Sequence, residues 1–291
     1  MGLENQRGWT RERILRTLRD RIDEGRPIIG AGSSAGIVAK SAEAGGADLI
    51  IVYSTGRSRM MGLATTPIGQ PNEVTMSMYD EIANVVESTP IIGGAQAGDP
   101  TYLRLNRLVD AFARTGFDGV INFPSAGLHP EYARKREHIG QGLRREAELV
   151  AEARRRDLLT LGYAYTDEHT RLLTEAGVDI LVPHAGWTTG GDLGADPGLA
   201  RGVEEAVEHV QRLIDIARAI RPDVIALAHG GAIASPADTR ELYRRTDAQG
   251  FLGASSIERI PIERAVRETV AAFKAESLTA MDTRVNDDPK E

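Results

Sequence analysis

The sequence predicts a single (β/α)8 TIM barrel with one extra helix ahead of the first strand. Three observations lead to this fold class: eight short apolar segments bounded by glycine or proline, an amphipathic stretch after each of them, and a length of 291 residues. Strict alternation of strands and helices implies parallel strands joined by right-handed crossovers. Eight such units favour a closed barrel, commonly about 250 residues long, over an open doubly wound sheet.

The apolar segments lack the polar alternation of a half-exposed strand, so each is predicted to be a strand buried on both faces. They comprise residues 27–31, 48–53, 90–95, 119–123, 158–163, 179–184, 223–229 and 250–254. The amphipathic stretches that follow are predicted to be helices: residues 34–44, 73–88, 102–115, 131–156, 167–176, 200–220, 236–248 and 262–274.

An extra helix is marked by the spacing of Ile14, Leu15, Leu18 and Ile22, with Thr10 as its cap. We expect this helix to close the bottom of the barrel. Residues 1–281 are expected to form one domain, and residues 282–291 a flexible tail.

Composition excludes several classes of function. The formal net charge is −7 and the basic residues are spread along the chain, which argues against a nucleic-acid partner. The absence of cysteine excludes disulfides, thiolate metal sites and cysteine nucleophiles. No apolar run approaches the roughly 20 residues that cross a bilayer, and residues 1–11 lack an apolar signal core. We therefore expect a cytoplasmic protein without a membrane partner.

The active site of such a barrel is expected on the loops that follow the strands. Glycine, serine and other polar residues gather at the carboxyl ends of the predicted strands, and the opposite ends are poor in them. The loops after strands 7 and 8 are candidates for binding a phosphate or carboxylate, because small residues let backbone N–H groups approach an anion. Their candidate residues are Gly230, Gly231, Gly253, Ser255 and Ser256. The alternative is that these glycines only make tight turns.

Two histidines, His184 and His229, end neighbouring strands at equivalent positions. They are predicted to act as general acid and base or to orient a substrate carbonyl. Alternatively, they bind a divalent metal, Mg or Zn, together with Asp99. For Asp99, capping of the following helix is the competing interpretation. His169 and His209 lie on predicted helices and are expected to be solvated.

The loop after strand 2 carries Arg57 and Arg59, whose planar guanidinium groups suit a substrate carboxylate. A role in bracing the loop is the alternative. Gly32 and Thr189 are further candidates for anion contacts, and Tyr53 or Asn122 is expected to polarise a carbonyl group.

The sequence lacks the features expected of two kinds of enzyme. None of the four lysines lies in a predicted strand, which argues against a Schiff-base aldolase. The Gly30-x-Gly32 pair is too short a match for a dinucleotide fingerprint, so no nucleotide cofactor is expected.

At these loops the sequence resembles the phosphoenolpyruvate hydrolase-like family of (β/α) barrels, also described as TIM-barrel signal transduction proteins. The resemblance runs in order from about residue 10 to 275 and rests on the segments 27–32, 45–50, 53–59, 122–124, 184–191, 229–231 and 253–259. It implies the barrel fold and chemistry on small phospho- or oxo-acids, like that of phosphoenolpyruvate mutase relatives. The acidic metal-binding motifs of those mutases are not evident here.

The resulting hypothesis is a hydrolase or carbon–carbon lyase that acts on a small anionic oxo-acid or enol phosphate. Two alternatives remain open from the residues: a barrel that senses a metabolite without turning it over, and a metal-dependent hydrolase. Association into a homo-oligomer is expected, because the exposed outer helices of one barrel often pack against those of another.

Overall fold

The computed structural model describes residues 8–278, except residues 197, 199 and 200. Eight parallel strands form one sheet in the order β7-β6-β5-β4-β3-β2-β1-β8. The strands are β1 (Ile28–Gly32), β2 (Leu49–Val52), β3 (Ile91–Gly94), β4 (Gly119–Ile121), β5 (Leu159–Ala164), β6 (Ile180–Pro183), β7 (Ile225–Ala226) and β8 (Gly250–Gly253). Backbone hydrogen bonds of Ala228 to Gly250 and Leu252 join β7 to β8, so the sheet closes on itself. The predicted (β/α)8 TIM barrel is therefore confirmed.

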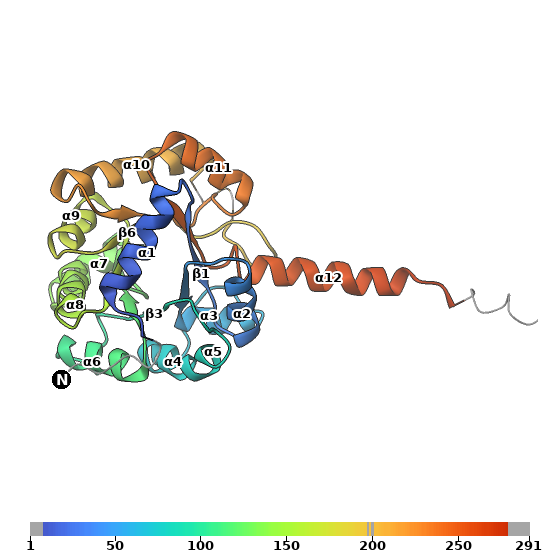
Figure 1. Cartoon of the computed structure of the whole chain (residues 1–291), viewed down its shortest axis with the longest axis horizontal. Coiled ribbons are helices and arrows are strands. Elements are labelled where there is room, and N and C mark those ends of the chain that lie inside the picture. Colours follow the sequence, from blue (N-terminus) through green and yellow to red (C-terminus); the bar gives the residue numbers. More distant parts are fainter. Residues whose placement is uncertain (1–7, 197, 199–200, 279–291) are drawn as a thin grey trace, which may run out of the picture.

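All of the helices except the last, α12, lie around the barrel (Figure 1). They are α1 (Arg11–Asp23), α2 (Gly36–Ala44), α3 (Ser54–Met60), α4 (Pro71–Ser77), α5 (Tyr79–Ala83), α6 (Leu105–Thr115), the 3-10 turn η1 (Ala126–Leu128), α7 (Pro130–Glu137), α8 (Leu143–Arg155), α9 (Asp167–Glu175), α10 (Val203–Ile220), α11 (Pro236–Arg245) and α12 (Arg259–Ala275).

Three segments of the chain differ from the sequence-based assignment of helices. The helix expected over residues 131–156 is two helices, α7 and α8. They are separated at Gly140, whose φ of +67° is a left-handed conformation that favours glycine. The helix expected over residues 73–88 is divided into α4 and α5 at Met78. The segment after β2, expected as a loop, is the helix α3.

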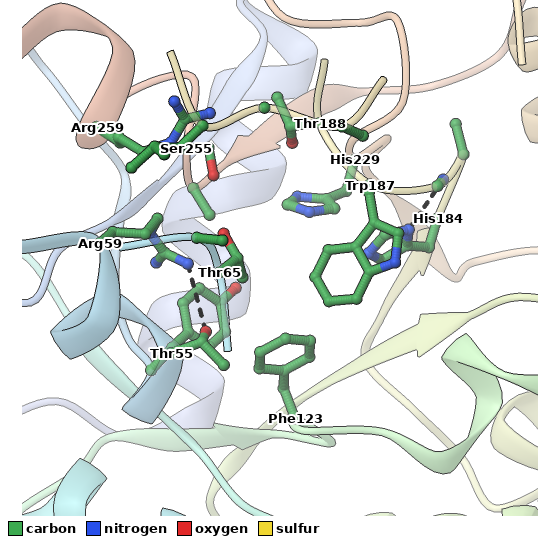
Figure 2. A pocket seen from close by; sticks show the side chains of 18 of the residues that line it. Thr55, Arg59, Thr65, Phe123, His184, Trp187, Thr188, His229, Ser255 and Arg259 are labelled. Atoms are coloured by element: carbon green, nitrogen blue, oxygen red, sulfur yellow. Dashed lines mark hydrogen bonds between the residues drawn. The ribbon is translucent and has the colours of Figure 1, made fainter. Parts of the chain in front are cut away.

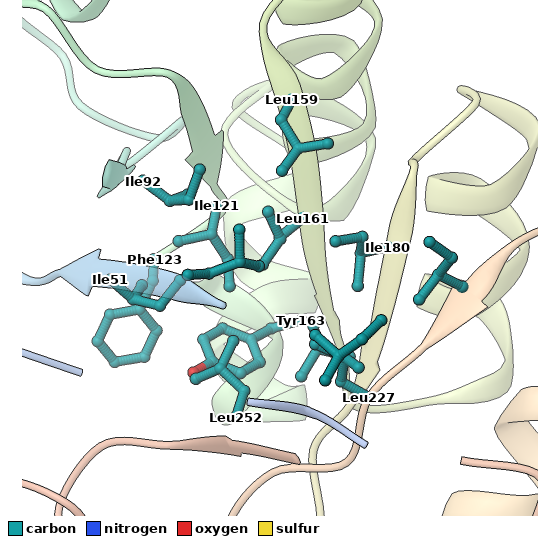
Figure 3. Packing of buried hydrophobic residues seen from close by; sticks show 14 of the residues in the cluster. Ile51, Ile92, Ile121, Phe123, Leu159, Leu161, Tyr163, Ile180, Leu227 and Leu252 are labelled. Atoms are coloured by element: carbon teal, nitrogen blue, oxygen red, sulfur yellow. The ribbon is translucent and has the colours of Figure 1, made fainter. Parts of the chain in front are cut away.

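The barrel interior is filled by branched apolar side chains from the strands (Figure 3). The extra N-terminal helix α1 packs on the same cluster through Ile14 and Leu18. Thr10 caps it as predicted, accepting a hydrogen bond from the backbone N–H of Arg13. Arg11 of α1 pairs with Asp179, just before β6 begins, at 2.5 Å. Helix α1 therefore closes the amino-terminal end of the barrel and leaves the carboxyl-terminal end open.

Helix α12 leaves the barrel and projects away from it (Figure 1). Its apolar side chains Ile262, Val266, Val270 and Phe273 are exposed, and Phe273 is 77% exposed. In the part of the chain that the structure describes, no helix has the length and apolar character needed to span a membrane. The tail expected over residues 282–291 lies outside the described residues.

Candidate active site

A cavity of about 580 Å³ opens at the carboxyl ends of the strands. The loops after β2, β4, β6, β7 and β8 contribute to its walls, and β5 contributes Tyr163 (Figure 2). This is the end of the barrel at which the active site was expected. Tyr53, Arg59, His184, His229 and Ser255, all predicted as site residues, line the cavity together.

His184 follows β6 and is 4% exposed. Its Nδ1 accepts a hydrogen bond from the backbone N–H of Gly186 at 3.1 Å, drawn as a dashed line in Figure 2. Because a neutral imidazole carries one proton, this bond places the proton of His184 on Nε2. His184 is therefore a hydrogen-bond donor through its other nitrogen.

His229 follows β7 and has the opposite arrangement. Its Nδ1 lies 2.6 Å from the backbone oxygen of Leu252, to which it can only donate. Its Nε2 is therefore left with a lone pair. The two histidine rings lie 4.5 Å apart between centroids, so a donor and an acceptor stand side by side at the cavity wall.

Both imidazoles are neutral near pH 7. Burial lowers the pKa of His229 to about 4, the largest cause being the cost of desolvating the charged ring. Burial also lowers the pKa of His184, and the neighbouring His229 lowers it further. The tautomers assigned from the hydrogen bonds are therefore the working forms of this pair.

Two buried tyrosines line the same cavity as the histidines. The hydroxyl groups of Tyr53 and Tyr163 lie 2.7 Å apart, and the Tyr163 hydroxyl lies 3.3 Å from His229 Nδ1. Burial raises the pKa of both tyrosines, so each keeps its phenolic proton. The Tyr163 ring packs 4.9 Å from the His229 ring and 5.1 Å from the His184 ring. Tyr163 thus packs against both imidazoles, and Tyr53 holds the Tyr163 hydroxyl.

Positive charge lies on the side of the cavity formed after β2 and β8. Arg59, from α3, is buried and donates through Nε to Glu258 at 2.9 Å and through Nη1 to Thr55 at 3.3 Å. Arg259 is also buried. Its Nη1 pairs with Glu263 at 2.8 Å, and its Nη2 donates to the backbone oxygen of Gly190 at 3.0 Å. Ser255 lies on the same wall. Together these groups can receive a carboxylate or phosphate.

Glu258 holds this cationic wall in place. Its Oε1 accepts the backbone N–H of Ser34 at 2.8 Å and also the Ser34 hydroxyl. Burial raises the pKa of Glu258, and the charge of Arg59 opposes that shift. The carboxylate thus connects the loop after β1, helix α3 and the start of α12.

Other predicted anion ligands do not line the cavity. Arg57 is exposed on α3. Gly230 and Gly231 brace the loop after β6: the Gly231 N–H donates to Gly186, and its carbonyl accepts from Thr189. The remaining predicted anion ligands absent from the cavity wall are Gly32, Thr189, Gly253 and Ser256.

At Gly32 the reason for glycine is packing rather than anion binding. A Cβ atom there would lie 2.8 Å from the Cα of Ala254, so only glycine allows β1 and the end of β8 to approach this closely.

The side chain of Asn122 forms hydrogen bonds within the fold. Its amide donates to Glu146 at 2.5 Å and to the Tyr163 carbonyl at 3.1 Å, and its oxygen accepts the Tyr163 N–H at 2.6 Å. It lines neither this cavity nor the adjoining one. The structure therefore gives Asn122 a role in positioning β5.

The structure does not assemble the metal site expected from Asp99, His184 and His229. Both Asp99 oxygens are occupied: Oδ1 accepts from Thr101, and Oδ2 accepts from Asn72 at 2.7 Å and from Gln70. Asp99 does not line the cavity that holds the histidines. Among the described residues, no three histidines or carboxylates gather in a way that could hold a metal ion. These donors therefore do not fit the proposed metal.

Two further histidines are buried, contrary to the expectation that they are solvated. His169 is fully buried and its Nε2 lies 3.3 Å from Glu146. His209 is 6% exposed, and burial lowers its pKa to about 4, opposed by its hydrogen bond to the backbone of His184. Both histidines face the barrel side of their helices, a position that helical periodicity alone did not reveal.

Several lining residues were missed in the sequence. Thr55, Phe123, Trp187 and Arg259 line the cavity, yet none was chosen as a site residue. Arg259 begins the helix after strand 8, at the same end of the barrel as the suspected anion loop, and this position was the available signal. Trp187 lies in the glycine-rich loop after β6, where an exposed aromatic residue is also a signal.

Comparison with known proteins gives a family match over most of the chain. The family described as "Phosphoenolpyruvate hydrolase-like" matches residues 13–275. The ToMV susceptible protein tm-1(GCR26) of Solanum lycopersicum is 40% identical over 271 residues, covering 91% of this chain and 36% of the relative. The chain thus spans little more than a third of that relative's length.

Solved structures give the same fold at low sequence identity. Phosphonopyruvate hydrolase, in complex with oxalate and Mg²⁺, is 18% identical with a TM-score of 0.57, covering 91% of this chain and 87% of the other. Oxaloacetate acetylhydrolase, in complex with its product oxalate, is 17% identical with a TM-score of 0.59, covering 92% and 88%. At these identities the likeness establishes the barrel fold.

Proposed function

Because the chain belongs to the phosphoenolpyruvate hydrolase-like family, we propose that it is a hydrolase or carbon–carbon lyase acting on a small anionic oxo-acid or enol phosphate. The observation that carries the proposal is the pair of neutral histidines with opposite tautomers. The fold neighbours that were solved in complex with oxalate support a small anionic ligand.

The anionic end of the substrate binds at the cationic wall. Arg59 and Arg259 supply guanidinium groups, and Ser255 supplies a hydroxyl group on the same side. Both arginines are buried, and a charge-assisted hydrogen bond is stronger in such surroundings than in water. The anion is thereby held with its carbonyl or enol carbon toward the histidines.

The two histidines then divide the proton chemistry. The lone pair on His229 Nε2 accepts a proton from water or from the substrate. The N–H on His184 Nε2 donates a hydrogen bond to the oxygen on which negative charge develops. Fixed donors of this kind commonly contribute about 3–4 kcal/mol to transition-state stabilisation. Neither role requires a charged imidazole in the resting enzyme.

The test is a turnover screen of purified protein against phosphoenolpyruvate and a panel of 2- and 3-oxo-acids, followed by NMR of the products. It is run in parallel with added Mg²⁺, Mn²⁺ or Zn²⁺ and with a chelator. Product formation that is lost in His184→Ala and in His229→Ala, with folding intact, is the expected result. Saturable thermal stabilisation without product from any compound would overturn the assignment in favour of a metabolite-sensing barrel.

We also propose that the chain forms a homo-oligomer through α12. The apolar side chains Ile262, Val266, Val270 and Phe273 recur at helical spacing along this helix and are exposed. An amphipathic helix normally buries such a stripe. A second copy of the chain supplies the simplest surface for it, because each copy exposes the same helix, which projects away from its own barrel (Figure 1).

A further inference from the structure

A second cavity of about 320 Å³ adjoins the one that holds the histidines. The two cavities share Thr55, Thr65, Phe123 and Trp187 as lining residues. Figure 2 shows Phe123 and Trp187 on the side of the first cavity where His184 lies. The Trp187 ring also lies 6.4 Å from the ring of His129, which lines the second cavity. One ligand can therefore extend from the first cavity into the second.

The combined space exceeds what a three- or four-carbon acid needs. Pockets of roughly 300–1,000 Å³ typically enclose drug-sized ligands, and the first cavity alone is about 580 Å³. The histidines line the first cavity and not the second. The second cavity thus adds binding surface away from the reacting atoms.

Arg136 gives the second cavity a positive charge. This arginine lies on α7, and its Nη2 donates to the backbone oxygen of Gly98 at 2.8 Å. Its guanidinium carbon stands 5.4 Å from the centre of the Tyr132 ring. None of the ion pairs recorded among the described residues includes Arg136, so no carboxylate of that part of the chain neutralises it.

Glu146 is the acidic residue of the second cavity, and its carboxylate is already occupied. Oε1 accepts the backbone N–H of Ala126 at 2.8 Å, and Oε2 accepts from Ser125 at 2.8 Å and from Asn122 at 2.5 Å. His169 lies 3.3 Å away on the buried side. With Glu146 bonded into the fold, Arg136 is the group left to recognise a ligand.

Resting on the function proposed for the first cavity, we propose that the second cavity binds the distal end of an elongated oxo-acid and that this end carries a carboxylate. The substrate class is then an oxo-dicarboxylate longer than four carbons. Its first carboxylate lies at Arg59 and Arg259, its carbonyl group at the histidines, and its second carboxylate at Arg136.

The first test is direct binding to the wild-type protein, measured by calorimetry so that turnover is not required. The probes are oxaloacetate, 2-oxoglutarate, 2-oxoadipate and 2-oxopimelate, each compared with the monocarboxylic oxo-acid of the same chain length. Affinity is expected to rise about tenfold from the shortest dicarboxylate to the longer one that binds best. One additional charge-assisted hydrogen bond accounts for an increase of this size. The monocarboxylic series is expected to show no such rise.

The second test replaces the proposed partner of the distal carboxylate. Arg136→Gln is expected to lower the affinity for the best long dicarboxylate about tenfold and to leave that for the matched monocarboxylic acid unchanged. Arg136→Lys should restore part of the loss. Arg134→Gln is the matched control, because Arg134 lies on the same helix, is exposed and does not line the second cavity.

The outcomes separate this inference from the proposed function. Equal affinity for short and long dicarboxylates would overturn the inference, whether or not the protein turns any of them over. So would an equal loss for both acids in Arg136→Gln. Length- and charge-selective binding without product would support the inference while contradicting the proposed chemistry.

Discussion

The two histidines differ in protonation because of what the backbone offers each ring. Gly186 presents an N–H to Nδ1 of His184, whereas Leu252 presents a carbonyl to Nδ1 of His229. The neighbouring strand ends β6 and β7 place the two residues opposite each other in a parallel bridge. A donor and an acceptor thus follow from two backbone groups, one in the loop after β6 and one in β8, rather than from any charged partner.

This arrangement predicts an unusual pH dependence. Since burial lowers the pKa of His229 to about 4, its Nε2 stays unprotonated well below the usual histidine range near 6.5. The value of kcat/KM should stay level from pH 8 to 6 and fall as the pH drops toward 4, because protonation removes the base. The measurement is a pH–rate profile with parallel NMR titration of the histidine Cε1 protons. An acid limb centred near pH 6.5 would count against the assigned role.

At the residue scale, the sequence predicted which side chains lie near the site more reliably than it predicted the role of each side chain. Equivalent positions at two strand ends were enough to predict that His184 and His229 converge. Asp99 and Asn122 also follow strands, but their hydrogen bonds lie within the fold. Apart from Thr101, which bonds to Asp99 locally, the contacts that orient them include Asn72 and Tyr163, which are 27 and 41 residues away in the chain. A local pattern could not show these distant contacts.

At the scale of elements, α3 depends on a buried ion pair. Arg59 of α3 and Glu258, which precedes α12, approach at 2.8 Å with both side chains almost fully buried. Glu258 also accepts two hydrogen bonds from Ser34 after β1. The helix, and with it the cationic wall of the site, is therefore held by tertiary contacts.

Removing one member of this pair should strongly destabilise the protein. Glu258→Ala leaves the Arg59 charge buried without its partner, which typically costs about 3–5 kcal/mol. Denaturant unfolding gives the free-energy change. The matched control is Glu24→Ala, which breaks exposed pairs with Arg21 and Arg26 and should cost at most about 1 kcal/mol. Similar losses in the two variants would refute the structural importance given to the buried pair.

The same contacts explain why α3 was not predicted. Residues 54–60 lack the apolar periodicity that identifies a helix from sequence, and its buried members are Ser54, Thr55, Gly56, Ser58 and Arg59. The strands were predictable because continuous apolar runs bounded by glycine or proline are local signals. The division of residues 131–156 into two helices was less predictable, although Gly140 and Gly142 lie where the two helices separate.

At the scale of the whole molecule, α12 is the helix, among those that the structure describes, that projects away with an exposed apolar stripe. The other helices lie around the barrel, whereas α12 points away from it (Figure 1). Arg259 is its one buried residue, which ties the start of the helix to the active-site wall. Association through α12 would therefore bring the subunit interface close to the proposed anion-binding side of the cavity.

We predict that the wild-type protein is an oligomer at micromolar concentration and that Val266→Glu with Val270→Glu shifts it to monomers. Burying apolar side chains contributes roughly 1.5–3 kcal/mol for each large one, and a carboxylate in the same place opposes burial. Light scattering after size-exclusion chromatography measures the mass. Thr269→Glu is the control, since Thr269 is exposed beside the stripe without belonging to it. A monomeric wild-type protein would contradict the prediction.

The central claim is that His184 and His229 act together on one transition state. The most direct measurement is kcat/KM for His184→Ala, His229→Ala and the double variant, with the substrate that the screen identifies. Each single variant should lose about 10²–10⁴-fold, and the double variant should lose little more than either, because groups that act as a unit are not additive. Turnover that survives in a folded double variant would contradict the account.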